Sequence, residues 1–528
     1  MKFLQLSPFV ILIASFPFAL SAQSSGSHPE NKIPAATNAI KQELLRGPYL
    51  QVATSEGIVI RWRTRLPATS SVQYGSNPHN LDMQAVSDTA VTDHVVKVAG
   101  LRPSTKYYYA ISSGGTKLQG DADNSFITLP PKGKEGFYRI GIFGDPGSLS
   151  PLQTRVRNQF FKYLGNAEMN AWMALGDIAY DQGLDPEYQA KFFNVYKDRL
   201  LKKYPLFPIP GNHDYRDNDS VAYLDQKDIE YFRTFSMPVN GESGGTPSHN
   251  PAYYSFDIGN IHILALDSFG EQDSTKLSDT SGPQVQWIKK DLEANENKDW
   301  VIAVWHHAPY SMGSHNSDDQ DELVKIRENF IPLLERYHVD LVICGHSHLY
   351  ERSKLMYGHY GKEATFNASE HDLSTSSGRY DGSRNSCPYI KDPVSNKGTV
   401  YLVNGGSSEL GGVQKAFPHE AMYYSSATYG GTNMLEVRGN RLDVKWICED
   451  GLIRDRFTMM KNVNKTSVVL LKKGQSATLS ASYIGNYEWN NKKTTRTIQV
   501  SPPVGTTTFT VHDKYGCVKD SFKVIVSK

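Results

Sequence analysis

From Tyr138 onward, apolar runs end again and again in short polar turns that contain glycine, and amphipathic stretches separate one run from the next. Runs that are apolar throughout are typical of strands buried on both faces. Their alternation with helical stretches favours an α/β domain with a largely parallel sheet, which we place at residues 135–460. The predicted strands read YRIGIFG, AWMALG, LFPIPG, IHILALD, WVIAVW and VDLVICG, and helices are predicted over 151–165, 185–203, 282–296 and 319–337.

The segments on either side of this domain carry a different pattern. Residues 45–130 contain runs such as GIVIRWRT and HVVKVAG, separated by short turns, as expected of a small all-β sandwich. Residues 462–528 are again strand-like and are long enough for one Ig-like sandwich. A chain of 528 residues is too long for a single core, which agrees with several domains. Residues 362–398, rich in Ser, Asn, Asp and Gly, are predicted to form a long surface loop.

The N-terminus predicts export. Residues 1–22 contain one lysine, an apolar run and a small residue at the end, which is the pattern of a cleaved signal peptide. The alternative is a membrane anchor, but the apolar run is short for a bilayer span. Residues 23–44 are polar and are predicted to be a flexible leader. We therefore expect a secreted protein, located outside the cell, in a periplasm or at the cell surface, with no membrane span in the rest of the chain.

Net charge bears on the binding partners of the chain, and cysteine content bears on how its fold is held together. The formal net charge of +1 gives no support to nucleic-acid binding or to a membrane-surface role. Four cysteines are too few for a scaffold held together by disulfides. One or two disulfides can form, in a pairing that the spacing does not define. Cys344, in the apolar run LVICG, is predicted to be a buried thiol.

Five short motifs carry the chemistry, and each follows directly on a predicted strand. In an open α/β sheet the carboxyl ends of the strands border the ligand crevice, so motifs far apart in sequence would meet there. Any one of them can be an ordinary turn, and their joint occurrence in this order indicates a site. They are Gly144-Asp145-Pro146-Gly147, Gly176-Asp177-Ile178-Ala179-Tyr180, Gly211-Asn212-His213-Asp214, His307-Ala308-Pro309 and Gly345-His346-Ser347-His348.

The residue types in these motifs suit metal ions. Carboxylate, phenolate, amide oxygen and imidazole are ligands for hard to borderline ions such as iron, zinc and manganese. The candidate ligands are too many for one tetrahedral zinc, and they fit two ions that share a bridging carboxylate. The sequence therefore predicts a two-metal site.

The motif set resembles the calcineurin-like metallophosphoesterases, and more closely the purple acid phosphatases, whose pattern is GDxG, GDxxY, GNH[ED], VxxH and GHxH. Here the elements read GDPG, GDIAY, GNHD, VWHH and GHSH. The runs RGPYLQ, IVIRW, SSVQYG and LRPSTKYYY are similar to the fibronectin-like N-terminal domain of the large, plant-type members. The resemblance covers about residues 45–460. It implies a four-layer metallophosphoesterase sandwich preceded by a fibronectin III-like domain, with the Ig-like segment outside it.

The resemblance also implies roles for single residues. Asp145, Tyr180 and His348 would bind Fe(III), and Asp177 would bridge the two ions. A divalent Zn, Mn or Fe would be bound by Asn212, His307 and His346. His213 would orient the substrate or act as general acid.

The residues around these ligands leave some roles open. His315 lies where the family carries further substrate-contacting histidines, but His315-Asn316 replaces the usual His pair, so the proton donor stays open between His213 and His315. Asp214 is either a carboxylate that orients a ligand or a turn residue. His306 is predicted to be structural, because strand alternation would point it away from the side that His307 faces.

The implied function is a secreted acid phosphatase that hydrolyses small phosphate monoesters with metal-bound hydroxide. Two alternatives stay open: a phosphodiesterase or nucleotide-cleaving enzyme on the same site, and a surface-binding protein with an inert central domain. Tyr180 favours the monoesterase. An inert domain would be expected to have lost at least one metal ligand, and none is missing here. Loops 241–250 and 362–398 would set leaving-group preference. For the C-terminal domain three roles stay open: contact with a cell surface, a part in export, or spacing of the enzyme. The natural substrate and the oligomeric state are not defined by the sequence.

Overall fold

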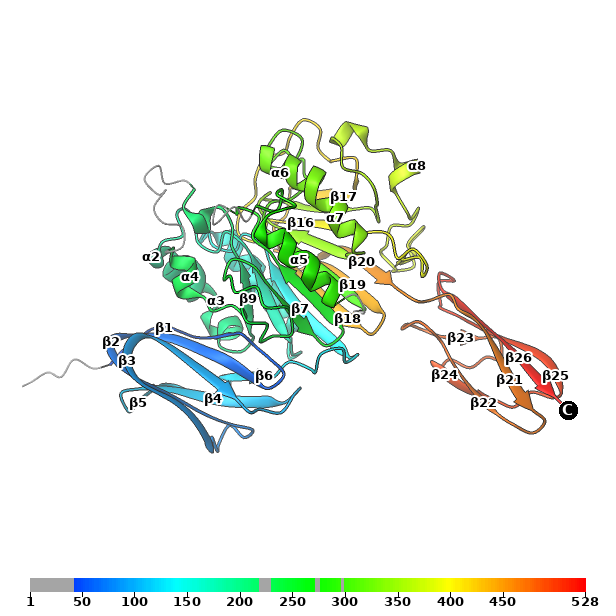
Figure 1. The fold of residues 1–528 in the computed structure, drawn as a ribbon, viewed down its shortest axis with the longest axis horizontal. Helices are drawn as coiled ribbons and strands as arrows, with labels where there is room; N and C mark the ends of the chain where they lie inside the picture. The colour runs from blue at the N-terminus through cyan, green and yellow to red at the C-terminus, as the bar shows by residue number, and fades with distance from the viewer. Residues whose placement is uncertain (1–41, 218–228, 271–275, 296–298) are drawn as a thin grey trace, which may run out of the picture. The chain divides into compact units, whose positions relative to one another are not determined.

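The computed structural model describes residues 42–217, 229–270, 276–295 and 299–528. The predicted signal peptide, residues 1–22, and residues 23–41 of the predicted leader lie outside the described residues. The leader was predicted to extend to residue 44, but strand β1 already begins at Leu44. Figure 1 shows the chain coloured from its N-terminus to its C-terminus.

The N-terminal domain is a β-sandwich, as predicted. Its long strand β2 pairs with β1 through residues 59–64 and with β4 through residues 70–75, and β3 pairs with β2 on its other side. Trp62 and Tyr109 of this domain are buried. The strands are β1 (Leu44–Gln51), β2 (Gly57–Gly75), β3 (Met83–Ala99), β4 (Lys106–Ser113), β5 (Thr116–Gln119) and β6 (Ser125–Ile127).

The central domain contains two seven-stranded sheets instead of one largely parallel sheet. Strands β11, β12, β13 and β16 run parallel in one sheet, and β7, β8 and β9 run parallel in the other. Tight connections such as those between β10 and β11 and between β18 and β19 can join only antiparallel neighbours, which makes both sheets mixed.

The two sheets have the following strand orders. The first is β10 (Tyr254–Ile258), β11 (Ile261–Ala265), β12 (Trp300–Trp305), β13 (Leu341–Cys344), β16 (Val400–Asn404), β14 (Tyr350–Ser353) and β17 (Met422–Ser426). The second is β15 (Tyr389–Ile390), β20 (Ile453–Met460), β19 (Arg441–Cys448), β18 (Gly431–Arg438), β7 (Phe137–Phe143), β8 (Ala171–Leu175) and β9 (Leu206–Ile209).

Alternate residues of β12 serve two cores. Ile302 and Val304 belong to the core that also contains Ile140 of β7, whereas Val301, Ala303 and Trp305 pack with helical residues. Helices α5 (Pro283–Ala294) and α7 (Ile331–Arg336) contribute Ile288 and Leu334 to this second core. The two sheets therefore share one apolar core, and helices provide a second core on the other face of the first sheet.

All four predicted helical segments are present. Helix α1 begins after Ser150, whose side chain accepts a hydrogen bond from the amide of Gln153, and it ends at Leu164, directly before Gly165. The helices are α1 (Pro151–Leu164), α2 (Asp185–Glu187), η1 (Tyr188–Phe193), α3 (Asn194–Tyr196), η2 (Lys197–Leu201), η3 (His213–Tyr215), α4 (Glu230–Thr234), α5 (Pro283–Ala294), α6 (Asp321–Lys325), η5 (Ile326–Phe330), α7 (Ile331–Arg336), η6 (Glu363–Thr365) and α8 (Ala368–His371). Within the part of the chain that the structure describes, no helix is long and apolar enough to cross a membrane.

The C-terminal domain consists of strands around its own apolar core, which includes Tyr483, Trp489 and Val524. Two sheets form it, one ordered β21-β26-β25-β23 and the other β22-β24. The strands are β21 (Thr466–Lys472), β22 (Ala477–Ser480), β23 (Glu488–Trp489), β24 (Thr497–Val500), β25 (Gly505–His512) and β26 (Lys519–Ser527).

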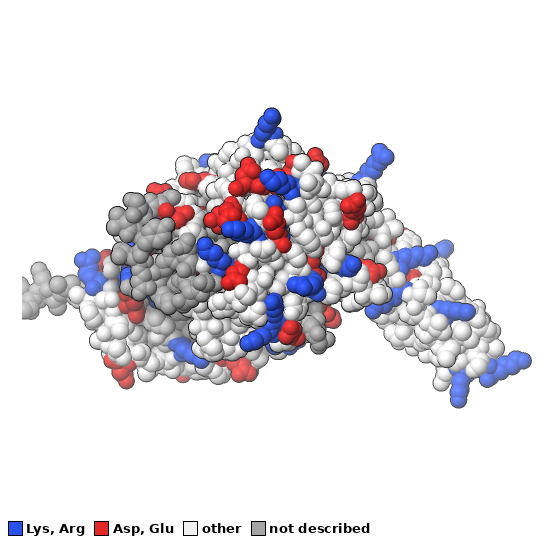
Figure 2. Space-filling model, turned by 45° about the horizontal axis from the view of Figure 1, so that its top comes forward, with Lys and Arg blue, Asp and Glu red and all other residues white. Residues whose placement is uncertain are grey.

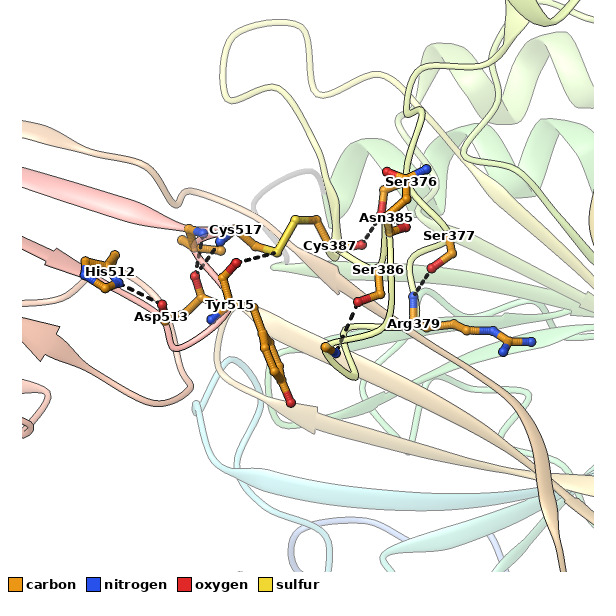
Figure 3. The surroundings of a disulfide bond; sticks show 12 residues. Ser376, Ser377, Arg379, Asn385, Ser386, Cys387, His512, Asp513, Tyr515 and Cys517 are labelled. Carbon is orange, nitrogen blue, oxygen red and sulfur yellow. Dashed lines mark hydrogen bonds between the residues drawn. A yellow bond between two sulfur atoms is a disulfide. The ribbon is translucent and has the colours of Figure 1, made fainter.

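A disulfide joins the C-terminal domain to the segment predicted as a surface loop. Cys387 of that segment bonds to Cys517, which lies in the turn between β25 and β26 (Figure 3). Residues 362–398 are indeed largely irregular, with only η6, α8 and β15 inside them. Cys344 is a buried free thiol, as predicted, and so is Cys448.

Candidate metal centre

The five motifs meet at the carboxyl ends of five parallel strands. Strands β7, β8 and β9 are neighbours in one sheet, and β12 and β13 are neighbours in the other. Their ends border a pocket of about 470 Å³. The residues that line it are Asp177, Asn212, His213, Asp217, Phe269, His307, His315, Gln320, Glu322, His346 and His348.

Three motif residues have backbone angles in a strained region of conformational space. Asp145, Asp177 and His346 have φ angles of 52°, 49° and 66°, in the left-handed region that residues with a Cβ avoid. Such angles persist at sites where the surroundings over-determine them. The glycines of the motifs allow this crowding, because a Cβ at Gly211 or Gly345 would overlap a carboxylate oxygen of Asp177 or Asp145.

One group of donor atoms comes from Asp145, Tyr180 and His348. The phenolic oxygen of Tyr180 lies 2.9 Å from His348 Nε2 and 3.2 Å from Asp145 Oδ2. His348 Nε2 lies 3.4 Å from the same Asp145 oxygen. Burial and the charges of Asp177 and Asp145 raise the pKa of Tyr180 well above its ordinary value, so ionising this phenol requires a cation beside it.

A second group of donor atoms surrounds Nε2 of His306. This nitrogen lies 3.2 Å from Asp177 Oδ2, 3.1 Å from Asn212 Oδ1 and 3.3 Å from His346 Nδ1. Asp177, His306 and His346 form a buried cluster whose ligand atoms all lie within 4.8 Å of one another, close enough to hold a metal ion. Of the residues predicted for the divalent ion, Asn212 and His346 are therefore in this group.

The prediction that His306 faces away from the site is wrong. It relied on strand alternation, but β12 ends at Trp305, so His306 and His307 lie beyond the pleated backbone to which alternation applies. Both histidines face the site. His307 lines the pocket, with its ring centroid 4.3 Å from that of His346 and its Nδ1 2.8 Å from Ser268 Oγ.

The chemistry of the second donor group fits a cation. His306 Nδ1 lies 2.8 Å from the carbonyl oxygen of Leu175, which can only accept, so Nδ1 carries a hydrogen, and in the neutral ring Nε2 offers a lone pair. Asn212 donates through its Nδ2 to Asp217, 2.6 Å away, which turns its Oδ1 inward. The Nε2 lone pair of His306 faces the oxygen atoms of Asp177 and Asn212, and a cation between these atoms would satisfy all three.

The electrostatics agree with this arrangement. Burial lowers the pKa of His306, but the carboxylates of Asp177 and Asp145 outweigh burial and raise it to about 10. Burial raises the pKa of Asp177, but the neighbouring His306 and His213 outweigh burial and hold this pKa below its ordinary value. The cluster therefore stabilises a positive charge next to Asp177, which is the requirement of a metal centre.

Asp214 connects two of the motifs. Its buried carboxylate accepts hydrogen bonds from the amides of Gly211 and Ile178 and from the hydroxyl of Tyr188, at 2.9, 3.3 and 2.5 Å. Burial and then the charge of Asp177 raise its pKa to about 7. These contacts favour the reading of Asp214 as a positioning residue over that of a simple turn residue.

Both candidate proton donors line the pocket. His213 Nδ1 contacts the carbonyl oxygen of Asp181 at 2.8 Å, and its Nε2 lies 3.9 Å from Asp177 Oδ2. The ring of His315 stacks on that of His346 with centroids 3.6 Å apart, and its Nδ1 lies 3.0 Å from Gln320 Oε1.

The rim of the pocket differs from the prediction. Segments 241–250 and 362–398 contribute none of the lining residues. The described rim is formed by Asp217, Phe269, Gln320 and Glu322 instead. Loop composition alone could not reveal this, because it does not say which loops follow the strand ends that border the pocket.

Comparison with known proteins places these features in a family. The purple acid phosphatase N-terminal domain matches residues 46–128, and the calcineurin-like phosphoesterase domain matches residues 138–350. Purple acid phosphatase 23 of Arabidopsis thaliana is 28% identical over 291 residues, which cover 50% of this chain and 58% of that protein. Acid phosphatase type 7 of Mus musculus is 24% identical over 429 residues, covering 74% and 85%.

The fold is shared with a solved plant structure. Purple acid phosphatase PPD1 from yellow lupin (Lupinus luteus) seeds superposes with a TM-score of 0.59 at 17% identity, covering 80% of this chain and 74% of that one. The chain spans less than two thirds of the length of several Arabidopsis relatives that it matches. Both domains of the family nevertheless occur here in order, and the chain belongs to the purple acid phosphatase family.

Proposed function

We propose that this protein is a secreted acid phosphatase that hydrolyses phosphate monoesters at a binuclear centre of Fe(III) and a divalent Zn, Mn or Fe ion. The observation that supports it most is the pair of donor groups around Asp177, one of which contains the phenol of Tyr180. Asp145, Tyr180 and His348 would hold the ferric ion. Asn212, His346 and one or both of His306 and His307 would hold the divalent ion, with Asp177 between the two.

The donor set matches ions of this kind, since oxygen and imidazole ligands suit iron, zinc and manganese. When bound, the two cations would offset the charge of the phosphate and make water more acidic. The protein's own contribution is then to orient the ester and to move a proton. His213 and His315 line the pocket and are the candidates to protonate the leaving oxygen.

The domain division supports the same function. We assign residues 45–130 to a fibronectin III-like domain, 135–460 to a four-layer metallophosphoesterase domain and 462–528 to an Ig-like domain. Residues 1–22 would be a signal peptide and 23–44 a leader. Secretion is supported by the Cys387–Cys517 disulfide, since such bonds persist in oxidising compartments.

Metal analysis joined to a pH–rate profile tests this function. We expect two metal ions per chain, a visible absorption band from the iron–tyrosine pair, and hydrolysis of an aryl phosphate monoester that is fastest below neutral pH. Asp177→Asn should lose metal and activity. Asp123→Asn, at an exposed site in the N-terminal domain, serves as the matched control. A faster reaction with diesters would favour the phosphodiesterase alternative, and a metal-free, inactive protein would contradict both.

A further inference from the structure

The C-terminal domain is strongly cationic although the whole chain is nearly neutral. Residues 462–528 contain nine Lys and one Arg against three carboxylates. Two of these carboxylates, Asp513 and Asp520, are fully buried and accept hydrogen bonds from backbone amides. The third, Glu488, lies 4.0 Å from His512. In the view of Figure 2 this domain shows blue side chains, whereas the central domain shows blue and red interspersed.

The cationic side chains are not spread evenly, because the sheet geometry gathers three of them around exposed aliphatic residues. Along β21 and β26 every second residue packs into the core of the domain, including Leu471, Phe522 and Val524. The residues between them face outward. We call six of these the outer face: Val468, Leu470, Lys472, Lys519, Lys523 and Ile525.

Strand pairing makes the outer face continuous. In the parallel pair of β21 and β26, Val468 lies opposite Lys523 and Leu470 lies opposite Ile525, so their side chains stand on the same side of the sheet. Val468 is 61% exposed and Leu470 is 75% exposed. An aliphatic strip flanked by lysines is thus open on the described surface of this domain.

We propose that the outer face docks on an anionic lipid surface. Positive charge on the domain favours an anionic partner and disfavours a second copy of the same face, since like charges repel. The aliphatic strip would enter the headgroup boundary, while the lysines reach the anionic headgroups with their flexible stems.

The chemistry of the face fits lipid better than another polyanion. Sites for single-stranded nucleic acid add aromatic stacking platforms to a basic groove, and arginine, unlike lysine, binds phosphate in a bidentate manner. The outer face offers lysine, a compact point charge, together with Val468, Leu470 and Ile525. Because Cys517 is bonded to Cys387, docking of this domain would hold the metallophosphoesterase domain at the same surface.

Vesicle co-sedimentation of the full chain tests the docking. Vesicles of phosphatidylcholine with about one third phosphatidylglycerol should sediment the protein at low salt, and pure phosphatidylcholine vesicles should not. Each lysine near an anionic leaflet is expected to strengthen binding about fivefold. The triple variant K472Q/K519Q/K523Q should therefore weaken binding about 100-fold. V468S/L470S should weaken it at high salt as well, because the aliphatic contribution is not screened.

A matched triple variant separates this face from charge in general. K492Q/K493Q/K514Q removes the same charge from exposed turns of the same domain and should weaken binding by less than about tenfold. Equal losses in the two triple variants would overturn the outer face as the docking site. Binding to soluble heparin but not to the anionic vesicles would overturn the lipid partner. All variants should keep the far-ultraviolet circular dichroism spectrum of the parent, and the binding measurement does not depend on phosphatase activity.

Discussion

Nε2 of His306 lies 3.2 Å from Oδ2 of Asp177, in the centre of the second donor group. The family pattern assigns the ligand at this strand end to His307, and both rings face the site. We predict that His306→Ala weakens metal binding at least 10-fold, because it removes a buried nitrogen that three other donor atoms surround. Metal content after dialysis, measured by mass spectrometry, is the readout.

His307→Ala is the necessary comparison for that prediction. If His307 alone completes the divalent set, its replacement lowers metal content and His306→Ala leaves it unchanged, which would contradict a ligand role for His306. His79→Ala, at an exposed site in the N-terminal domain, controls for the loss of an imidazole.

The leaving group should distinguish His213 from His315. His213 Nε2 lies 3.9 Å from Asp177 Oδ2, whereas the ring of His315 is held against His346 and Gln320. We therefore expect His213→Asn to lower kcat for an alkyl phosphate by about 100-fold or more, because an alkoxide leaves only when protonated. For an aryl phosphate with an acidic phenol the loss should stay below about 10-fold. A leaving-group-dependent loss in His315→Asn instead would assign the proton donor to His315.

Removing the disulfide should destabilise the chain without abolishing catalysis. Cys387 and Cys517 are separated by 130 residues, so their bond restricts the unfolded chain strongly. We predict that C387S/C517S lowers the free energy of unfolding by about 3 to 5 kcal/mol and increases proteolysis at the start of the C-terminal domain. Urea titration with and without reductant measures the effect, and an unchanged unfolding midpoint in reductant would contradict it. Activity should persist, because the bond does not border the metal pocket.

Stability should fall in acid partly through His94. This ring is buried in the N-terminal domain between the hydroxyls of Thr64 and Ser70, at 2.8 and 2.7 Å. Burial lowers its pKa from 6.5 to about 4. As pH falls below 6.5 the unfolded chain therefore binds the proton first, and the stability contributed by the neutral ring is lost between pH 6.5 and about 4. The full loss is about 3 kcal/mol.

His94→Gln tests this pH dependence. The variant should be less stable than the parent at pH 7, and the gap should narrow at pH 5, because glutamine does not titrate. Burial also lowers the pKa of His359 to about 4 and of His419 to about 3, so some acid sensitivity should remain. The measurement is the free energy of unfolding from urea titration of both proteins at the two pH values. If the difference between parent and variant is the same at pH 7 and pH 5, His94 does not contribute to the acid sensitivity.

Much of the fold and of the site could be predicted from the sequence because the signals are local. Apolar runs that end in glycine-containing turns identify β7, β8, β9, β12 and β13 as buried strands. Asp145, Asp177 and His346 follow such strands directly, so their convergence followed from the rule that strand ends border the crevice. The partition of the strands between two sheets was not visible, because it depends on pairing between residues far apart in the chain.

The sequence by itself predicted a two-metal centre, since the types and order of the candidate ligands are read from the motifs. Only the tertiary structure showed that His306 as well as His307 faces the centre, because the backbone leaves β12 at Trp305 and alternation no longer applies. Only the tertiary structure paired Cys387 with Cys517 across 130 residues. The lysines of the C-terminal domain can be counted in the sequence. Their gathering around Val468 and Leu470, with two of the three carboxylates buried, is a consequence of strand register and packing.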